Sequence, residues 1–290
     1  MSTSGTRGRG PLEAVIFDWA GTIVDYGSFA PTKVLMEAFQ ERGVAVSLAE
    51  ARVPMGLPKW HHIQALGRLP AVAQRWKTHM DRPFTTEDVD ALYARFMPLQ
   101  MAYIGAYSQP IPGAIELVAA LRAQGVRTGG SSGYPRAVMD RLVQCAREQG
   151  LELDHTLAGD ELKPGGRPGP WMALANVIEL GVRDVAACVK VDDTEPGIAE
   201  GLGAGMWTVG IAVSGNEMGL SQVEVEALDP AELHRKREQI GATFRDWGAH
   251  YVIDTVADLP RVLAHIEARR SQRSVRPRLR RRSLLSGGAC

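Results

Sequence analysis

Four groups of polar residues lie at or just after apolar stretches of the sequence, and their residue types could transfer a phosphoryl group. They are Asp18, Ser131-Ser132-Gly133-Tyr134, Lys163-Pro164-Gly165-Gly166-Arg167-Pro168 and Asp192-Asp193. In an open α/β sheet, ligands bind outside the carboxyl ends of the strands, so polar residues placed there are available for chemistry. A carboxylate can attack phosphorus, while hydroxyl groups, backbone N–H groups and a cationic side chain hold the phosphoryl oxygens. The ordered set of acid, hydroxyl, base and acid therefore predicts a phosphoryl-transfer site.

The carboxylates also predict a bound cation, because hard oxygen ligands favour Mg²⁺ over zinc. Ala20 lies two residues after Asp18. Many phosphoryl-transfer enzymes with this opening carry a second Asp at that position, which protonates an alkoxide leaving group. The sequence keeps the attacking carboxylate and lacks this proton donor. We therefore expect a leaving group other than an ordinary alcohol oxygen.

Short apolar runs alternate with helical patterns outside one long stretch near the N-terminus, which predicts a mostly parallel sheet with helices on both faces. The expected strands are 14–17, 125–129, 185–191, 207–211 and 251–253. The expected core helices are 114–123, 136–149, 170–180 and 196–203. The sequence therefore indicates an α/β fold with a Rossmann-like parallel sheet.

The first two expected strands are separated by about 100 residues, far more than a single crossover helix requires. Residues 29–103 have helical periodicity and almost no strand signal. The apolar residues that share helix faces there include Leu35, Ala38, Phe39, Leu92, Phe96 and Leu99. Turn-forming residues at 109–113 would return the chain to the core. We expect an inserted α-helical cap at 29–103 over the strand ends, and a core made of residues 12–28 and 104–267.

The formal charge of the whole chain is zero, but basic residues are concentrated at both ends. Residues 269–290 hold eight Arg and residues 1–10 hold two, without any acid, so the body has 23 basic and 33 acidic residues. This acidic body argues against nucleic-acid binding as the main function. We expect disordered basic ends at 1–11 and 268–290, although the arginines of the second end could contact an anionic surface.

The cysteine and hydropathy patterns favour a cytoplasmic protein. Cys145, Cys188 and Cys290 are too few and too scattered for a disulfide framework or a zinc site, which fits a reducing compartment. No apolar run approaches the roughly 18 residues that would indicate a membrane span. The first ten residues lack the apolar stretch of a secretory signal. We therefore expect a protein without a membrane segment.

The phosphoryl-transfer set and its helical insertion resemble the haloacid dehalogenase superfamily. Within it, the chain is similar to the phosphonoacetaldehyde hydrolase family from about Leu12 to about Glu267. The segments that carry this resemblance are Phe17–Thr22, Val24–Gly27, Pro54–Lys59, Gly133-Tyr134, Gly166–Pro168, Pro170–Met172 and Ala204–Gly210. The resemblance implies hydrolysis of the P–C bond of phosphonoacetaldehyde to acetaldehyde and phosphate, in the degradation of 2-aminoethylphosphonate. It also implies a Mg²⁺ cofactor and a homodimer joined through the cap.

The resemblance further implies roles for individual residues. Lys59 matches the family's Schiff-base lysine, and its iminium would accept the electrons of the broken P–C bond, so that no acid is needed at Ala20. Asp18 would attack phosphorus, and His62 would assist proton transfer around the imine. The implied residues that bind substrate or phosphate are Ser132, Gly133, Arg167, Met55 and Tyr134. The implied metal ligands are Asp18, the backbone carbonyl of Ala20, and Asp193.

One position departs from the family pattern. The family's last acidic motif has Gly-Asp and a second acid four residues after that Asp, whereas this chain has Asp192-Asp193 followed by Gly197. Asp193 keeps the metal-ligand position. Asp192 could compensate for the missing acid from behind the ligands.

Two other functions stay open at this point. The same scaffold could hydrolyse small phosphomonoesters, although Ala20 would leave the alkoxide without a proton donor. The chain could also be an inactive binding module, with the arginine-rich end as its partner surface. Packing roles remain alternatives for His62, Met55 and Tyr134.

Overall fold

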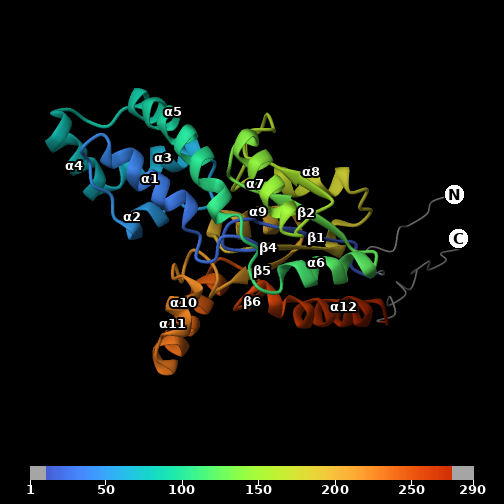
Figure 1. The fold of residues 1–290 in the computed structure, drawn as a ribbon. Coiled ribbons are helices and arrows are strands. Elements are labelled where there is room, and N and C mark those ends of the chain that lie inside the picture. The colour runs from blue at the N-terminus through green and yellow to red at the C-terminus, as the bar shows by residue number, and fades with distance from the viewer. Residues whose placement is uncertain (1–10, 276–290) are drawn as a thin grey trace, which may run out of the picture.

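The computed structural model describes residues 11–275, which form a parallel α/β core with a helical cap inserted after the first strand (Figure 1). One six-stranded sheet has the order β3-β2-β1-β4-β5-β6, and all neighbouring strands are parallel. The strands are β1 (Ala14–Phe17), β2 (Arg127–Ser131), β3 (His155–Leu157), β4 (Cys188–Asp192), β5 (Trp207–Ile211) and β6 (Tyr251–Ile253). The predicted α/β class with a parallel sheet is confirmed.

The central strand β1 decides where a site can form, because it lies between β2 and β4. Phe17, its last residue, pairs with Gly130 on β2 and Val191 on β4. The residues that follow these three positions therefore meet at one carboxyl edge of the sheet. Asp18 is one of them, in agreement with the expectation that the polar groups gather there.

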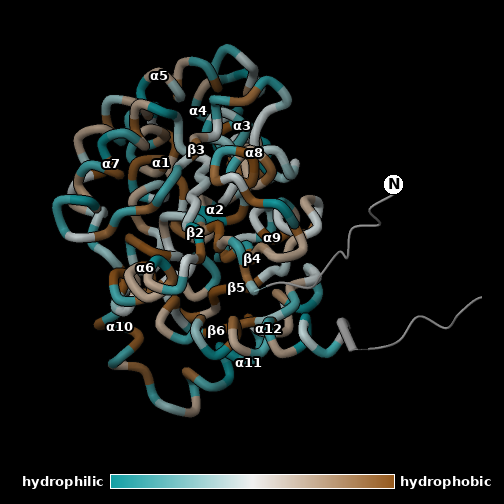
Figure 2. Tube along the Cα trace, turned by 90° about the vertical axis from the view of Figure 1, so that its right-hand side faces the viewer, coloured by the Kyte–Doolittle hydropathy of each residue, from teal (hydrophilic) through white to brown (hydrophobic). Residues whose placement is uncertain are grey.

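Helices cover both faces of this sheet. The core helices are α6 (Ala114–Ala123), α7 (Arg136–Glu148), α8 (Trp171–Glu179), α9 (Glu195–Ala204), α10 (Gln222–Glu226), α11 (Pro230–Asp246) and α12 (Leu259–Val275). Val15 and Phe17 of β1 belong to the largest apolar cluster, which includes residues of α6 and α12. Ala14 and Ile16 point to the other face and pack with α8, because successive side chains of a strand alternate. Figure 1 shows these two helical layers, and Figure 2 shows apolar segments along β4 and β5 between them.

Five helices between β1 and α6 form the cap at one end of the sheet (Figure 1). They are α1 (Ala30–Gln40), α2 (Leu48–Arg52), α3 (Lys59–Arg68), α4 (Pro70–Met80) and α5 (Thr86–Tyr103). The six apolar residues expected on shared helix faces are all buried in the main apolar cluster. Phe39, Trp76 and Phe84 add aromatic contacts, with ring centroids 6.0 Å apart for Phe39–Trp76 and 4.9 Å for Trp76–Phe84. The short 3-10 helix η1 (Ile104–Tyr107) returns the chain to the core.

Two strands begin later in the chain than the sequence analysis expected. β2 starts at Arg127 because Gly125 forms a turn at φ +75°. Its two glycines are required by packing, since a Cβ at Gly130 would lie 2.5 Å from Trp19 Nε1. The start of β4 moves to Cys188 because Val185–Ala187 is a 3-10 helix, η2, capped by the Asp184 side chain.

The sequence analysis did not predict β3, α10, α11 or α12. β3 has only three residues and lies at the edge of the sheet, where it is partly exposed. α11 is long but largely polar, so its apolar periodicity is weak. Its start signal is present, because the Asp229 side chain accepts hydrogen bonds from Ala231 N and Glu232 N.

The expectation of a disordered end from residue 268 is wrong for residues 268–275. They continue α12, which docks beside the core after the 3-10 helix η3 (Val256–Asp258). Arg270 donates a hydrogen bond to the Ala186 carbonyl, and the Arg269 guanidinium lies 5.0 Å from the Trp207 ring centroid. The remaining basic residues at 1–10 and 276–290 lie outside the described residues. Within residues 11–275, no helix is long and apolar enough to cross a membrane.

Candidate active site

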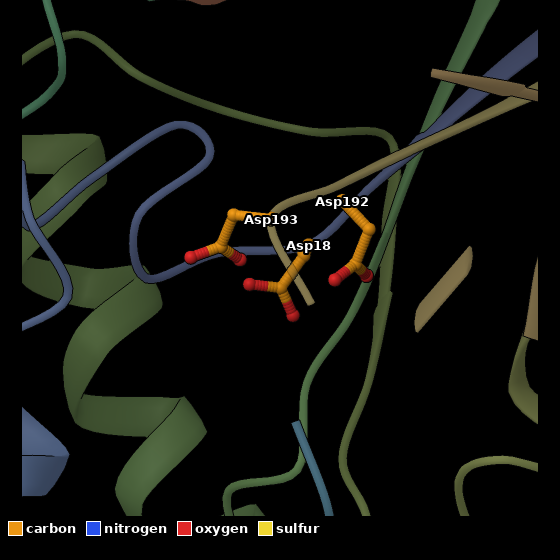
Figure 3. A group of neighbouring side chains, drawn as sticks. All are labelled: Asp18, Asp192 and Asp193. Atoms are coloured by element: carbon orange, nitrogen blue, oxygen red, sulfur yellow. The ribbon is translucent and has the colours of Figure 1, made fainter. Parts of the chain in front are cut away.

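Three aspartates meet at the carboxyl edge of the sheet (Figure 3). Asp18 follows β1, Asp192 ends β4, and Asp193 is the next residue. One carboxylate oxygen of each lies within 4.8 Å of the others, and all three side chains are buried. Such a group of hard oxygen atoms suits Mg²⁺. The structure therefore brings together both expected carboxylate ligands and adds Asp192 to them.

Two buried cations lie behind this cluster. The Arg167 guanidinium is 2.8 Å from Asp18 Oδ1, 3.1 Å from Asp192 Oδ2 and 2.8 Å from Glu200 Oε2. Lys190 Nζ is 2.9 Å from Asp192 Oδ2 and 3.3 Å from Glu200 Oε2. Although burial opposes ionisation, Arg167 and Lys190 hold the pKa of Asp192 below its usual range. Asp192 is thus an ionised carboxylate that is paired with two cationic side chains of the protein itself, Arg167 and Lys190.

Asp193 has a different environment from its neighbour. Its carboxylate accepts a 2.8 Å hydrogen bond from Asn216 N and a 3.4 Å hydrogen bond from Thr22 Oγ1, and no cationic side chain of residues 11–272 forms an ion pair with it. Burial, and then the charges of Asp18 and Asp192, raise its pKa well above the usual value. The four carboxylates of this buried group outnumber the two cations that form ion pairs with them, and Asp193 is the carboxylate left without an ion pair, so a divalent cation would offset the excess negative charge. The residues present fit Mg²⁺.

Gly197, the position where the family pattern has an acid, leaves room for Asp192. A Cβ added to Gly197 would lie 1.9 Å from the Asp192 Cγ atom. The Asp192 carboxylate is held there by Thr194, whose backbone N–H and Oγ1 donate to Oδ1 at 3.0 and 2.7 Å. Asp192 therefore places a carboxylate in the space that a side chain at residue 197 would need.

The two serines at the carboxyl end of β2 have different surroundings. Ser131 Oγ accepts hydrogen bonds from Arg167 at 3.1 Å and from Lys190 at 3.0 Å. Ser132 lines a small cavity beside Asp18, and its Oγ accepts a hydrogen bond from Tyr134 N at 3.2 Å. Ser132 is thus the hydroxyl that faces the cavity, as expected.

The cavity contains nearly all of the residues expected to act on a substrate. Its lining residues are Asp18, Ala20, Ser28, Pro31, Met55, Gly56, Lys59, Ser132, Gly133, Tyr134, Arg167 and Thr194. Its volume is about 20 Å³, which is room for about one water molecule. The cap is therefore closed on the core, and a substrate must enter before closure.

Lys59 reaches this cavity from the cap. It is the first residue of α3, only 5% exposed, and its Nζ lies 5.1 Å from the Tyr134 ring centroid. Burial lowers the pKa of Lys59 to about 8, because Asp18 offsets the loss of solvation only in part. In the same cavity, burial raises the pKa of Asp18 to about 6, opposed by Arg167. An amine that is partly neutral at neutral pH thus lies beside a carboxylate.

Close backbone packing brings the cap loop onto the core. Gly56 has φ +88°, and a Cβ there would lie 2.4 Å from Thr194 Oγ1. A Cβ on Gly133 would lie 2.5 Å from the Leu57 carbonyl oxygen. These two glycines permit the contact between cap and core that buries Lys59.

His62 lies one turn after Lys59 in α3, but it is not among the residues that line the cavity. Its Nε2 lies 2.9 Å from the Ala51 carbonyl oxygen, which assigns the proton to Nε2. Its Nδ1 is buried and has no hydrogen-bond partner among the described residues. Burial, with the charge of Lys59 adding to it, lowers the pKa of His62 well below the usual value. A neutral His62 with a free Nδ1 could accept a proton, and that role stays a prediction.

Lys190, Glu200 and Asn216 are the site residues that the sequence analysis missed. Lys190 had a usable signal, because it interrupts an apolar central strand two positions before Asp192 and so shares its face of the strand. A lysine buried there must find acidic partners. Glu200 and Asn216 had no comparable signal, since they lie on a helix and a loop that folding brings to the strand ends.

Comparison with known proteins agrees with a parallel α/β hydrolase whose acids meet at the strand ends beneath a helical cap. The haloacid dehalogenase-like hydrolase family matches residues 12–205. The chain is 56% identical over 262 residues to a phosphonoacetaldehyde hydrolase from Salmonella newport, covering 90% of this chain and 97% of the relative. It is also 56% identical over 259 residues to that of Klebsiella pneumoniae, covering 89% and 96%.

A solved structure agrees with these sequence relatives. A phosphonoacetaldehyde hydrolase-like protein from Oleispira antarctica superimposes with a TM-score of 0.90 at 42% identity, covering 94% of this chain and 98% of the other. The chain therefore belongs, among the haloacid dehalogenase-like hydrolases, to the phosphonoacetaldehyde hydrolase family. It is an enzyme of the hydrolase class.

Proposed function

We propose that this protein cleaves the P–C bond of phosphonoacetaldehyde to give acetaldehyde and phosphate, as a step in the degradation of 2-aminoethylphosphonate. The observation that carries the proposal is the buried amine of Lys59, which shares a small cavity with the Asp18 carboxylate. The names of the relatives at 56% identity support the substrate. Ala20 supports the type of bond, because a carbon leaving group needs no acid at that position.

Lys59 begins the reaction by condensing with the aldehyde. The neutral Nζ attacks the carbonyl carbon, water leaves, and an iminium forms. The lowered pKa of Lys59, about 8, makes the neutral amine accessible near pH 7. The iminium then provides a place for the electrons of the P–C bond, which would otherwise remain on a carbanion.

Asp18 takes the phosphoryl group. One carboxylate oxygen attacks phosphorus, the P–C electron pair moves into the iminium, and an enamine and an aspartyl phosphate result. Protonation of the enamine carbon and hydrolysis of the imine release acetaldehyde and free Lys59. A water molecule then attacks the aspartyl phosphate, which releases phosphate and restores the Asp18 carboxylate.

The remaining site residues hold charge and exclude water. Arg167, Ser132 and the backbone of Gly133 would bind the phosphoryl oxygens, with Arg167 already 2.8 Å from Asp18. Asp18, Asp193 and the Ala20 carbonyl would hold Mg²⁺, which supplies positive charge to the phosphoryl oxygens when bound.

Two further residues, Met55 and Tyr134, lie around the imine position, and a third, His62, lies outside the cavity lining, one turn after Lys59 in α3. Met55 and Tyr134 line the cavity around Lys59 and would shield the imine from bulk solvent. His62, with its unpartnered Nδ1, would move protons near the imine. These roles complete the set of residues expected to act on the substrate.

The assembly and compartment belong to the same proposal. We expect a homodimer through the cap, supported by the exposed apolar side chains Met101 and Tyr103 on α5, which are 39% and 41% exposed. Size-exclusion chromatography with light scattering tests this, and a monomer at micromolar concentration would contradict it. The buried free thiols of Cys145 and Cys188 support a reducing, cytoplasmic setting.

The direct test is detection of acetaldehyde from phosphonoacetaldehyde, with and without added Mg²⁺. The proposal expects equal amounts of acetaldehyde and phosphate, and loss of both when the metal is chelated. A panel of sugar phosphates provides the comparison with phosphomonoester hydrolysis. Turnover of the sugar phosphates without turnover of phosphonoacetaldehyde would overturn the proposal.

A further inference from the structure

Arg52, the last residue of α2, joins the cap to a core loop that is distant in sequence. Its Nη1 donates to the Asn216 carbonyl oxygen at 3.3 Å and to Asn216 Oδ1 at 3.1 Å, and its Nη2 donates to the Gly219 carbonyl oxygen at 3.4 Å. The planar guanidinium supplies these donors in a fixed fork, which a lysine cannot reproduce. The loop at 214–219 is therefore bound directly by the cap.

The same core loop holds Asp193. Asn216 N donates to Asp193 Oδ2 at 2.8 Å, and a Cβ on Gly215 would lie 2.5 Å from Asp193 Cβ. The loop thus packs on this aspartate with no space between them. A continuous series of contacts runs from Arg52 through Asn216 to the Asp193 carboxylate, which forms no ion pair with the described side chains.

Arg52 is also tied to the segment that carries the buried amine. Its carbonyl oxygen accepts a hydrogen bond from Met55 N at 3.0 Å, at the start of the turn that leads to Lys59. Its guanidinium lies 5.1 Å from the ring centroid of Phe29, where the chain enters the cap. One side chain therefore contacts the cap entrance and the metal-binding edge of the core.

We propose that Arg52 is a positioning residue that couples closure of the cap to binding of the divalent cation at Asp193. With the cap closed, Arg52 fixes the 214–219 loop, and the loop fixes the Asp193 carboxylate for its ligand. Because coupling between two equilibria is reciprocal, the bound cation in turn favours the closed cap. The inference rests on the proposed function only in naming Asp193 as a ligand, and it assigns Arg52 no contact with substrate.

The test compares Arg52→Gln with Arg75→Gln. Arg75, on α4, is a matched control because its guanidinium forms a 2.7 Å ion pair with Glu50, which lies on α2 as Arg52 does. This pair lies within the cap and does not reach the core. Mg²⁺ affinity is measured by calorimetry without substrate, and hydrogen exchange is followed at residues 55–63. We expect Arg52→Gln to weaken Mg²⁺ binding about tenfold, within the usual range of such couplings, and to lose the Mg²⁺-dependent protection of residues 55–63. Arg75→Gln is expected to match the wild type in both.

Two further results complete the test. Arg52→Lys keeps the charge and is expected to give an intermediate Mg²⁺ affinity, and it replaces Arg52→Gln if that variant does not fold. Mg²⁺ affinity within twofold of wild type in the Arg52 variant, with unchanged protection, would overturn the coupling. A wild-type protein that binds no Mg²⁺ and shows no Mg²⁺-dependent protection would overturn both the coupling and the metal ligand assignment. A protein that shows the coupling but does not cleave phosphonoacetaldehyde would overturn only the proposed substrate.

Discussion

Replacing Lys59 with Met should stabilise the protein at neutral pH while it abolishes the proposed reaction. Burial lowers the pKa of Lys59 from its ordinary value near 10.5 to about 8. Each pKa unit corresponds to about 1.36 kcal/mol, so the charged amine costs about 3 kcal/mol of folding free energy at pH 7. Met has similar length and fills the same apolar space without a charge. We therefore expect Lys59→Met to raise the free energy of unfolding by about 3 kcal/mol.

The pH dependence of this gain distinguishes its cause from simple repacking. Below pH 8, Lys59 is protonated in both the folded and the unfolded state, so the full cost is present. Between about pH 8 and 10.5, the folded state has lost the proton and the unfolded state has not, so stability rises with pH. From pH 7 to 9.5, wild type should therefore gain about 2 kcal/mol relative to Lys59→Met.

Urea denaturation at the two pH values measures both effects. Lys77→Met is the matched control, because Lys77 is exposed on α4, and surface substitutions usually change stability by less than about 0.5 kcal/mol. Parallel stability curves for wild type and Lys59→Met, or a less stable variant at pH 7, would refute the assignment of Lys59 as a buried amine of low pKa.

Three other predictions follow from the same site. The kcat/KM for phosphonoacetaldehyde should rise with pH through about 8, as Lys59 loses its proton; a pH-independent rate from 6 to 9 would contradict this. Gly197→Ala should lower the free energy of unfolding by about 1–3 kcal/mol through overpacking, because the added Cβ would lie 1.9 Å from the Asp192 carboxylate. Gly203→Ala is the control: its Cβ would lie 3.5 Å from the nearest atom, so the melting temperature should be unchanged or higher. Lys190→Met should destabilise the fold by about 3–5 kcal/mol in urea denaturation, since it removes one of the two buried cations that pair with Asp192 and Glu200; a loss below 1 kcal/mol would oppose the charge balance described for the site.

Much of the fold could be predicted because strong local patterns agree with the tertiary structure. The runs 14–17, 207–211 and 251–253 coincide with β1, β5 and β6, and 114–123 coincides with α6. These segments are apolar enough for periodicity to show them. β3 and α11 could not be found in this way, because a three-residue edge strand and a polar helix depend on contacts made elsewhere.

The candidate site could be predicted less completely than the fold. Residues at strand ends, such as Asp18 and Asp193, were found because parallel strands bring their carboxyl ends together. Lys59 was found only through the resemblance, since nothing in the sequence alone shows that the cap loop closes on Thr194. Asn216 was not found, because its contribution is a backbone N–H that only the folded loop directs at Asp193.

The central claim is that the amine of Lys59 bonds covalently to the substrate while the carboxylate beside it takes the phosphorus. Borohydride reduction in the presence of phosphonoacetaldehyde, followed by peptide mass spectrometry, tests this most directly. The account predicts a reduced imine adduct on Lys59, on no other lysine, with activity lost in proportion to the adduct. An unmodified Lys59 together with substantial activity in Lys59→Ala would contradict it.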